Sequence, residues 1–132
     1  MNGETQSATI PPSKAKRVTL WIVSIVVAAM FIMAGGTKVV GLPMHVEHFQ
    51  KWGYPDWFRI LIGIAEVAGG AGLLIPRLAS FAAAGLAAIM LGAVYTHLAH
   101  DEASQVVAPG VFLLVFAVLA YARWPRRRGV LA

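Results

Sequence analysis

Three ionisable side chains lie inside or beside long apolar stretches, where charged residues are rare. Glu66 is the lone charge within 60–75, and Lys38 and His97 each end an uncharged run. A carboxylate at the centre of a bilayer costs roughly 2.5–3.5 kcal/mol, so it persists where it is paired, protonated or used. A Lys38–Glu66 ion pair would offset much of this cost. We expect a binding site near the outer face at a polar cluster: Lys38, Glu66, His97, Tyr95 and Thr37.

Other interpretations of the same residues stay open. A Lys38–Glu66 pair can serve only to fix the register of two helices, and Lys38 can instead extend its ammonium group outward to lipid phosphates. Alternatively, Glu66 is protonated because burial disfavours its charge, and it donates a hydrogen bond to a carbonyl. Ionisable residues within a membrane are treated first as functional candidates, so the binding-site hypothesis is retained. The sequence assigns no catalytic role to any residue.

The four histidines form a second set, because they occur in two pairs with three-residue spacing. Imidazole groups are common ligands of zinc and other transition metals. The spacing matches no established ligand motif, however, and solvated histidines at a membrane interface explain it more simply. We therefore expect no bound metal. The weaker alternative is a metal site built from His45, His48, His97 and His100.

The composition is typical of a membrane protein. Of 132 residues, 58% are hydrophobic and only 13% are charged, whereas about a quarter are charged in a typical soluble domain. Cysteine is absent, which excludes disulfides, thiol redox chemistry and cysteine-ligated clusters. The net charge of +5 comes mainly from basic groups near the two termini, beside apolar segments. This placement indicates membrane anchoring and argues against nucleic-acid binding.

Four apolar segments are long enough to place these residues across a bilayer. A helix rises 1.5 Å per residue, so about 20 residues cross a hydrocarbon core of about 30 Å. We expect an all-α membrane protein, a bundle of four transmembrane helices over about 18–40, 57–75, 77–98 and 103–123. This domain, 18–124, would lie between a disordered basic N-terminal tail, 1–17, and a basic C-terminal tail, 125–132.

The basic residues also predict the orientation. With both termini cytoplasmic, eight of the eleven basic residues lie on the inner side. We therefore expect a multi-pass protein of the bacterial cytoplasmic (inner) membrane with the N- and C-termini inside. Between the first two helices, Pro43 begins a segment with Met44, Val46, Phe49 and Trp52, which predicts a short amphipathic helix at the outer interface.

Small residues at four-residue spacing predict close helix packing. Such residues let two backbones approach each other within lipid. They are densest in the second and third predicted helices, which we therefore expect to pack together. The spaced sets are Ala65 with Gly69, Ala68 with Gly72, and Ala84 with Ala88 and Gly92.

Three segments carry a resemblance to a known family: FIMAGGTKVVG, FQKWGYPDWFRILIGIAEVAGGAGLLIPR and AAGLAAIMLGAVYTHL. In this order they resemble the DoxX-like family of small four-helix bacterial membrane proteins, over about two-thirds of the chain. The broader DoxX group is associated with a subunit of a quinone-linked sulfur-oxidising oxidoreductase and with oxidative-stress membrane complexes. Related eukaryotic members act as receptor-assembly chaperones. The resemblance implies that Lys38, Glu66 and His97 are the matching polar positions, and it assigns them no reaction.

Three functions compete. The first is an accessory subunit of a membrane redox or stress-response complex, in which Lys38 and His97 donate to quinone carbonyls and Glu66 relays protons. Without cysteine, such a role requires a bound quinone or a partner's cofactor. The second is a non-catalytic bundle that binds a lipid or a membrane or periplasmic protein and assists assembly. The third is a small proton-coupled carrier, for which four helices suffice only in a homo-oligomer. We expect that the chain is not an enzyme on its own.

Overall fold

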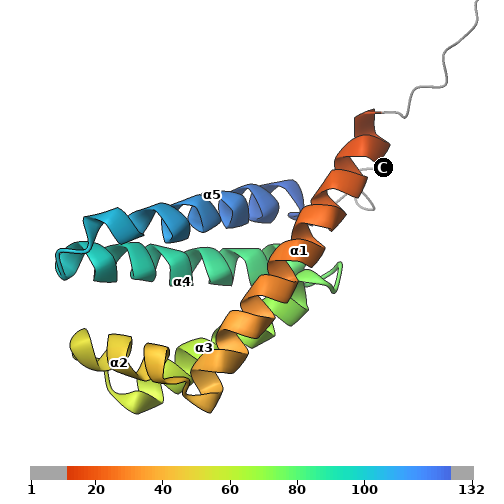
Figure 1. The fold of residues 1–132 in the computed structure, drawn as a ribbon. Helices are drawn as coiled ribbons and strands as arrows, with labels where there is room; N and C mark the ends of the chain where they lie inside the picture. The colour runs from red at the N-terminus through yellow and green to blue at the C-terminus, as the bar shows by residue number, and fades with distance from the viewer. Residues whose placement is uncertain (1–11, 126–132) are drawn as a thin grey trace, which may run out of the picture.

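A computed structural model describes residues 12–125, and every element within this range is a helix. Figure 1 shows the order of the elements along the chain. They are α1 (Pro12–Val40), α2 (Pro43–Lys51), α3 (Asp56–Leu73), α4 (Ala79–Ala99), the 3-10 helix η1 (Ala103–Val106) and α5 (Val107–Ala122). The all-helical fold and the short helix before α3 agree with the prediction.

The first helix begins earlier than predicted. Most of the two predicted tails, 1–11 and 126–132, lies outside the described residues. Residues 12–17, however, were assigned to the disordered tail and belong to α1. Pro12 suits the first helical position because its fixed φ is already helical, and the following lysines, alanine and arginine favour helix.

The helices form two layers. Helices α4 and α5 pack side by side, while α1 crosses α3 in the other layer, which also carries α2 (Figure 1). Gly35 and Gly63 mark the crossing, because a Cβ atom on Gly35 would lie 2.5 Å from the carbonyl oxygen of Gly63. Only glycine permits such an approach of two backbones. Gly70 repeats the contact two turns further along α3, against the carbonyl oxygen of Ala28.

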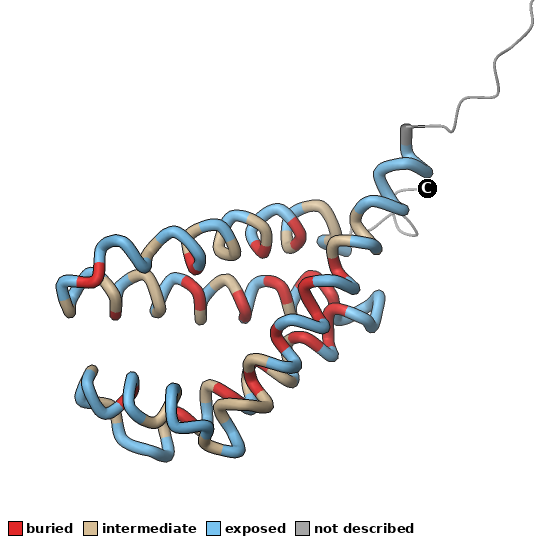
Figure 2. The backbone as a smooth tube through the Cα atoms, in the orientation of Figure 1, coloured by how far each residue is buried: buried red, intermediate tan, exposed pale blue. Residues whose placement is uncertain are grey.

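One end of the molecule, which we call the core end, joins the two layers through apolar packing. Figure 2 shows buried backbone positions gathered where α1 and α3 meet α4 and α5. Phe31 packs edge-on against Phe112 and Phe116, with ring centroids 5.0 and 4.9 Å away. Arg123 closes this end by donating to the Leu73 carbonyl at 3.0 Å. The core comprises Val27, Ala28, Phe31, Leu73, Ala83, Leu86, Met90, Phe116 and Leu119.

Within residues 12–125, three helical stretches are long and apolar enough to cross a membrane: Ser13–Val40, Ala79–Ala99 and Ala103–Ala122. The fourth predicted span is helix α3, which has 18 residues and carries Asp56, Arg59 and Glu66. In α1 the charged residues lie near the two ends and leave a long uncharged run, whereas in α3 Glu66 lies in the middle of the helix. The outward side of α5 is apolar, as expected for a face in lipid; its exposed residues include Val107, Val111, Leu114 and Val118.

The prediction from small residues is confirmed for one contact and wrong for another. Cβ atoms on Gly69 and Gly72 would meet Leu86 and Ala82 of α4, so α3 and α4 do approach closely there. Ala84, Ala88 and Gly92 were expected to pack as well, but all three are exposed. A Cβ atom on Gly92 would meet nothing within 4 Å. The small side chains at Ala88 and Gly92 instead leave a cavity open.

Candidate functional site

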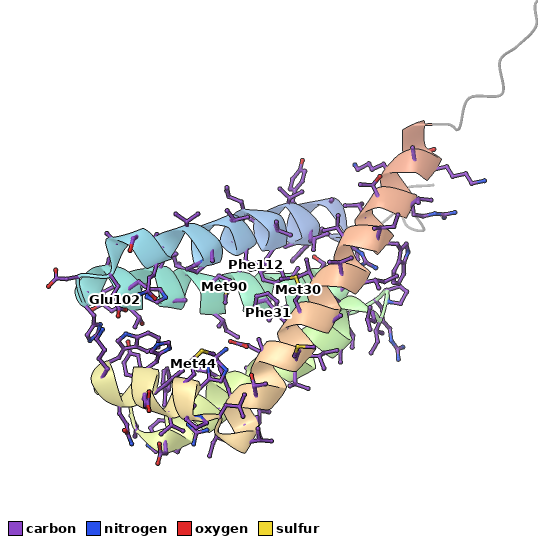
Figure 3. The ribbon with its side chains drawn as sticks, in the orientation of Figure 1. Met30, Phe31, Met44, Met90, Glu102 and Phe112 are labelled. Carbon is purple, nitrogen blue, oxygen red and sulfur yellow. The ribbon has the colours of Figure 1, made fainter. Side chains whose placement is uncertain are left out.

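A cavity of about 630 Å³ lies between α4 and the layer formed by α1, α2 and α3. This volume falls within the range of small-molecule sites. We call this end of the molecule the cavity end; Figure 3 shows the space between the two layers, with Met44 and Met90 labelled. Four aromatic residues on the α2–α3 side line it and contact one another: Phe49, Trp52, Tyr54 and Phe58.

The ion pair expected between α1 and α3 is present at the cavity. Lys38 Nζ lies 3.0 Å from Glu66 Oε2, and the two side chains are 17% and 3% exposed. Each residue follows its crossing glycine, Gly35 or Gly63, by three positions, so the close approach of the helices places the side chains together. Arg59 donates to the carbonyl of Lys38 and thereby caps the last turn of α1.

A second polar contact joins α1 to α2. Thr37 Oγ1 donates to the Ala34 carbonyl at 2.8 Å and lies 2.9 Å from Nε2 of His45. His45 lines the cavity beside Lys38. Burial lowers the pKa of His45, and the positive charge of Lys38 lowers it further. His45 is therefore a neutral ring at pH 7, next to the ion pair.

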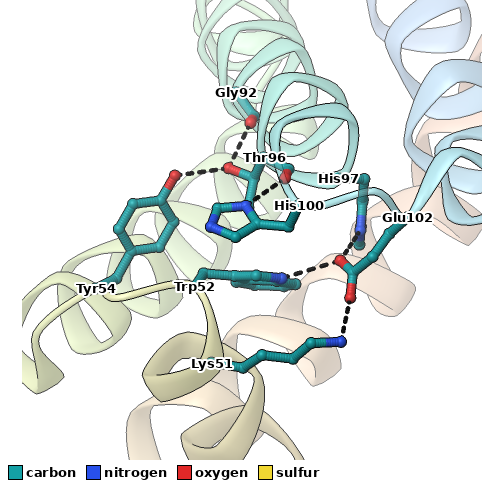
Figure 4. A network of polar contacts seen from close by, with 8 residues as sticks. All are labelled: Lys51, Trp52, Tyr54, Gly92, Thr96, His97, His100 and Glu102. Carbon is teal, nitrogen blue, oxygen red and sulfur yellow. Dashed lines mark hydrogen bonds and ion pairs between the residues drawn. The ribbon is translucent and has the colours of Figure 1, made fainter.

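A network around Glu102 holds the cavity end together (Figure 4). Its carboxylate accepts hydrogen bonds from Lys51 Nζ at 2.9 Å and Trp52 Nε1 at 2.9 Å, both on the α2 side. It also lies 3.0 Å from Nδ1 of His97 on α4. The bonds from Lys51, His97 and Trp52 lower the pKa of Glu102 to about 2, so this side chain is ionised at neutral pH.

A turn after α4 brings Glu102 back to this position. The backbone N–H of Glu102 donates to the carbonyl of His97 at 2.8 Å, and Asp101 has a positive φ of 57°. This is the hydrogen-bond pattern that ends many helices with one left-handed residue, a conformation that aspartate tolerates. Beside the network, Tyr54 and Thr96 link the two layers through their hydroxyl groups, 2.8 Å apart.

The predicted polar cluster is divided between two places. His97 lines the same cavity as Lys38 and Glu66, but its side-chain partner is Glu102. The cavity itself separates α4 from the ion pair, which explains why the expected three-residue contact does not form. Tyr95 lines the cavity with a largely exposed ring. Thr37 does not line the cavity, but it contacts His45, which does.

The histidines do not converge on a metal site. His45 contacts Thr37, His97 contacts Glu102, and His100 Nδ1 donates to the Thr96 carbonyl at 2.7 Å. Within residues 12–125, no group of three or more histidine, aspartate or glutamate side chains is arranged to hold a metal ion. The alternative of a site at His45, His48, His97 and His100 is therefore not supported.

Sequence reasoning missed Glu102, Lys51 and Trp52 as members of the site. Glu102 follows a helix end beside Asp101 and reads as a solvated loop residue. Its partners precede it by about fifty positions, and no periodicity connects the two segments. The tryptophan in a short amphipathic segment was the one available signal, since a buried indole N–H needs an acceptor.

Comparison with known proteins identifies the family. The pattern of the DoxX-like family matches residues 22–119. The chain belongs to the DoxX-like family. The matched region of this DoxX-like chain includes every residue that lines the cavity.

One relative is a Bacillus subtilis (strain 168) protein named "Uncharacterized protein YdgD". It is 34% identical over 85 residues, which cover 61% of the present chain and 75% of the relative. No solved structure matches. The family membership and the apolar helices together support a helical membrane protein.

Proposed function

We propose that this DoxX-like protein binds the ring of a membrane quinone, in either redox state, and serves as an accessory subunit of a membrane redox complex. The observation that carries the proposal is the aromatic-lined cavity of about 630 Å³ with polar groups at its edges. Aromatic walls suit a flat ring. The ammonium group of Lys38 has three N–H donors, of which one is bonded to Glu66, so it can also donate to a quinone oxygen.

The accessory role rests on what the chain brings to electron transfer. It contains no cysteine, so a thiol or a cysteine-ligated cluster cannot carry electrons within it. Oxidation or reduction of a bound quinone would therefore use the cofactor of a partner subunit. The chain would supply binding, orientation and hydrogen bonds.

Bound quinone can be tested with two glycine variants of α4. A Cβ atom on Gly92 or on Gly85 would meet nothing within 4 Å, but Gly92 lines the cavity and Gly85 does not. Gly92→Leu should fill the cavity without disturbing the helix, and Gly85→Leu is the matched control. We expect wild type and Gly85→Leu, purified from quinone-containing membranes, to yield quinone on solvent extraction and Gly92→Leu to yield several-fold less. Absence of quinone from all three preparations would refute the proposal.

A lipid-binding assembly factor is the second candidate. The cavity wall on α4 includes small apolar groups at Ala88, Gly92 and Ala93, near Ile62 of α3, and such a surface also accepts an acyl chain. The same extracts distinguish the two functions. Enrichment of one phospholipid in wild type, lost in Gly92→Leu, would favour lipid binding over quinone binding.

We also propose that α3 is a fourth span and that both termini are cytoplasmic, in the inner membrane of a bacterium. The close crossing with α1 supports this, because it holds α3 at the depth of an apolar helix. Eighteen residues reach about 27 Å, close to the thickness of a bilayer core. Because the chain lacks cysteine, Ser13→Cys and Ser104→Cys can be labelled singly in intact cells. An impermeant maleimide should label position 104 alone; labelling of position 13 would reverse the orientation.

A further inference from the structure

Two histidines of the cavity, one from each layer, have hydrogen bonds that fix their tautomers. A threonine hydroxyl has one hydrogen to donate. Thr37 gives it to the carbonyl of Ala34, which can only accept. Thr37 Oγ1 must therefore accept from His45 Nε2, which lies 2.9 Å away. The proton of the neutral His45 ring is on Nε2, and Nδ1 carries the lone pair.

His97 is fixed in the opposite sense. Glu102 is ionised, because its hydrogen bonds with Lys51, His97 and Trp52 lower its pKa to about 2. An ionised carboxylate can only accept, so Nδ1 of His97 must carry the proton that points at Oε1, 3.0 Å away. In the neutral ring of His97, Nε2 is therefore the acceptor. Trp52 Nε1 donates to the same oxygen and holds the arrangement in place.

We propose that the cavity selects a ring with two hydroxyl donors, so that the reduced quinol form binds more tightly than the quinone. This inference rests on the proposed function and names the preferred ligand within it. The acceptors would be His45 Nδ1, from the α1–α3 layer, and His97 Nε2, from α4; both side chains line the cavity. A quinol hydroxyl donates to such a nitrogen, whereas a quinone oxygen can only accept and leaves the lone pair unmatched.

Neighbouring charges agree with this preference. Lys38 lies beside His45 and is a donor, and a quinol hydroxyl can accept from Lys38 while it donates to His45. Burial and the charge of Lys38 lower the pKa of His45, so its ring remains neutral and keeps its lone pair at pH 7. The negative charges of Glu66 and Glu102 are each engaged by a lysine, at 3.0 and 2.9 Å.

The tautomers can be measured without any ligand. Nitrogen-15 NMR of the histidine-labelled protein distinguishes the two protonated nitrogens, and single histidine substitutions assign the four rings. We expect His45 protonated on Nε2 and His97 on Nδ1. In Glu102→Gln, His97 should no longer be held in one tautomer, because an amide can donate as well as accept. In Thr37→Val, His45 should likewise lose its tautomer preference, because the hydroxyl acceptor is gone. The matched controls are Glu47→Gln, the same change at an exposed position of α2 that does not line the cavity, and Thr19→Val, which removes a hydroxyl bonded to the Ala15 carbonyl far from the cavity.

Ligand selection is then tested with three probes under anaerobic conditions: a short-chain 1,4-benzoquinol, the matching quinone, and the 1,4-dimethoxy derivative. In wild type we expect the quinol to bind about tenfold more tightly than either compound without donors, because its hydroxyl groups form hydrogen bonds that those compounds cannot form; tenfold corresponds to about 1.4 kcal/mol. Glu102→Gln and Thr37→Val should each reduce this ratio, while Glu47→Gln and Thr19→Val should keep it.

The outcomes separate this inference from the proposed function. If quinol and quinone bind wild type equally well, the selection for the reduced form is overturned and quinone binding stands. If the NMR spectra show the opposite tautomers, the inference is overturned whatever the affinities. If none of the three probes binds, the proposed function is refuted and the selection falls with it.

Discussion

The two ends of the interface between the helical layers are built differently. At the core end, Phe31, Leu73 and Phe116 belong to one buried apolar cluster, and Phe116 and Leu73 are 0% exposed. At the cavity end, the layers meet through side-chain hydrogen bonds that converge on Glu102 and through the Tyr54–Thr96 pair. Apolar packing stabilises most where no space is left, because groups that line a void lose contacts. Hydrogen bonds between long side chains can join two layers across a gap. The fold is therefore stabilised by apolar packing at the core end, while hydrogen bonds at the other end leave room for a cavity.

The largest expected effect is at the core end. Phe116→Ala should lower the free energy of unfolding by about 3–5 kcal/mol, because a fully buried ring is replaced by a void. Val118→Ala, on the same helix, is the control, since Val118 is 60% exposed and touches lipid in our interpretation. Reversible unfolding in mixed detergent micelles measures both. Equal losses for the two variants would contradict the placement of the core.

The ion pair beside the cavity should rank second. Lys38→Met leaves Glu66, which is 3% exposed, without its partner, and breaking a buried pair costs about 3 kcal/mol. A double variant, Lys38→Met with Glu66→Met, should recover most of the loss because neither charge is then buried. The free energies of unfolding of the single and the double variant are compared in the same detergent micelles. If the double variant is no more stable than the single one, the pair contributes through more than its charge.

The helices with their ion pair and the Glu102 network differ in how well the sequence predicted them. The long apolar runs are local signals, and so are the isolated charges of Lys38 and Glu66 within or beside them, so the helices and the ion pair could be expected. The Glu102 network depends on a left-handed turn at Asp101 and on pairing with Lys51, fifty-one positions away. Such contacts arise from the assembled layers. For the same reason, small residues at Ala88 and Gly92 predicted packing where the structure has a cavity.

Acid should open the cavity end and leave the core end closed. The pKa of Glu102 is lowered from 4.5 to about 2 by its partners, so its bonds are fully present above pH 4.5 and are lost as the pH falls towards 2. Once Glu102 is protonated, the ammonium group of Lys51 and the N–H groups of His97 and Trp52 no longer have an anion to bind. Spin labels at Gln50→Cys and Ser104→Cys, both exposed, should show a longer and broader distance at pH 2.5 than at pH 6.

A second pair of labels tests the contrast directly. Ile75→Cys, in the turn after α3, and Tyr121→Cys, on α5, are both exposed positions at the core end. The distance between labels at these two positions should not change with pH. In a Glu102→Gln background the Gln50–Ser104 distance should also be independent of pH. An acid-dependent distance in that background would assign the opening to a group other than Glu102.

The smallest effect should come from Lys51, and its size tests which contacts hold the cavity end. Its side chain is 61% exposed, and exposed ion pairs contribute about 0–1 kcal/mol because water screens the charges. In Lys51→Met, Glu102 keeps the bonds from Trp52 and His97, so unfolding and the Gln50–Ser104 label distance should remain near wild type. Trp52→Phe removes the indole N–H and keeps an aromatic ring, and should broaden that distance more. If Lys51→Met has the larger effect, the two layers are held by surface charge, and the network would weaken with added salt.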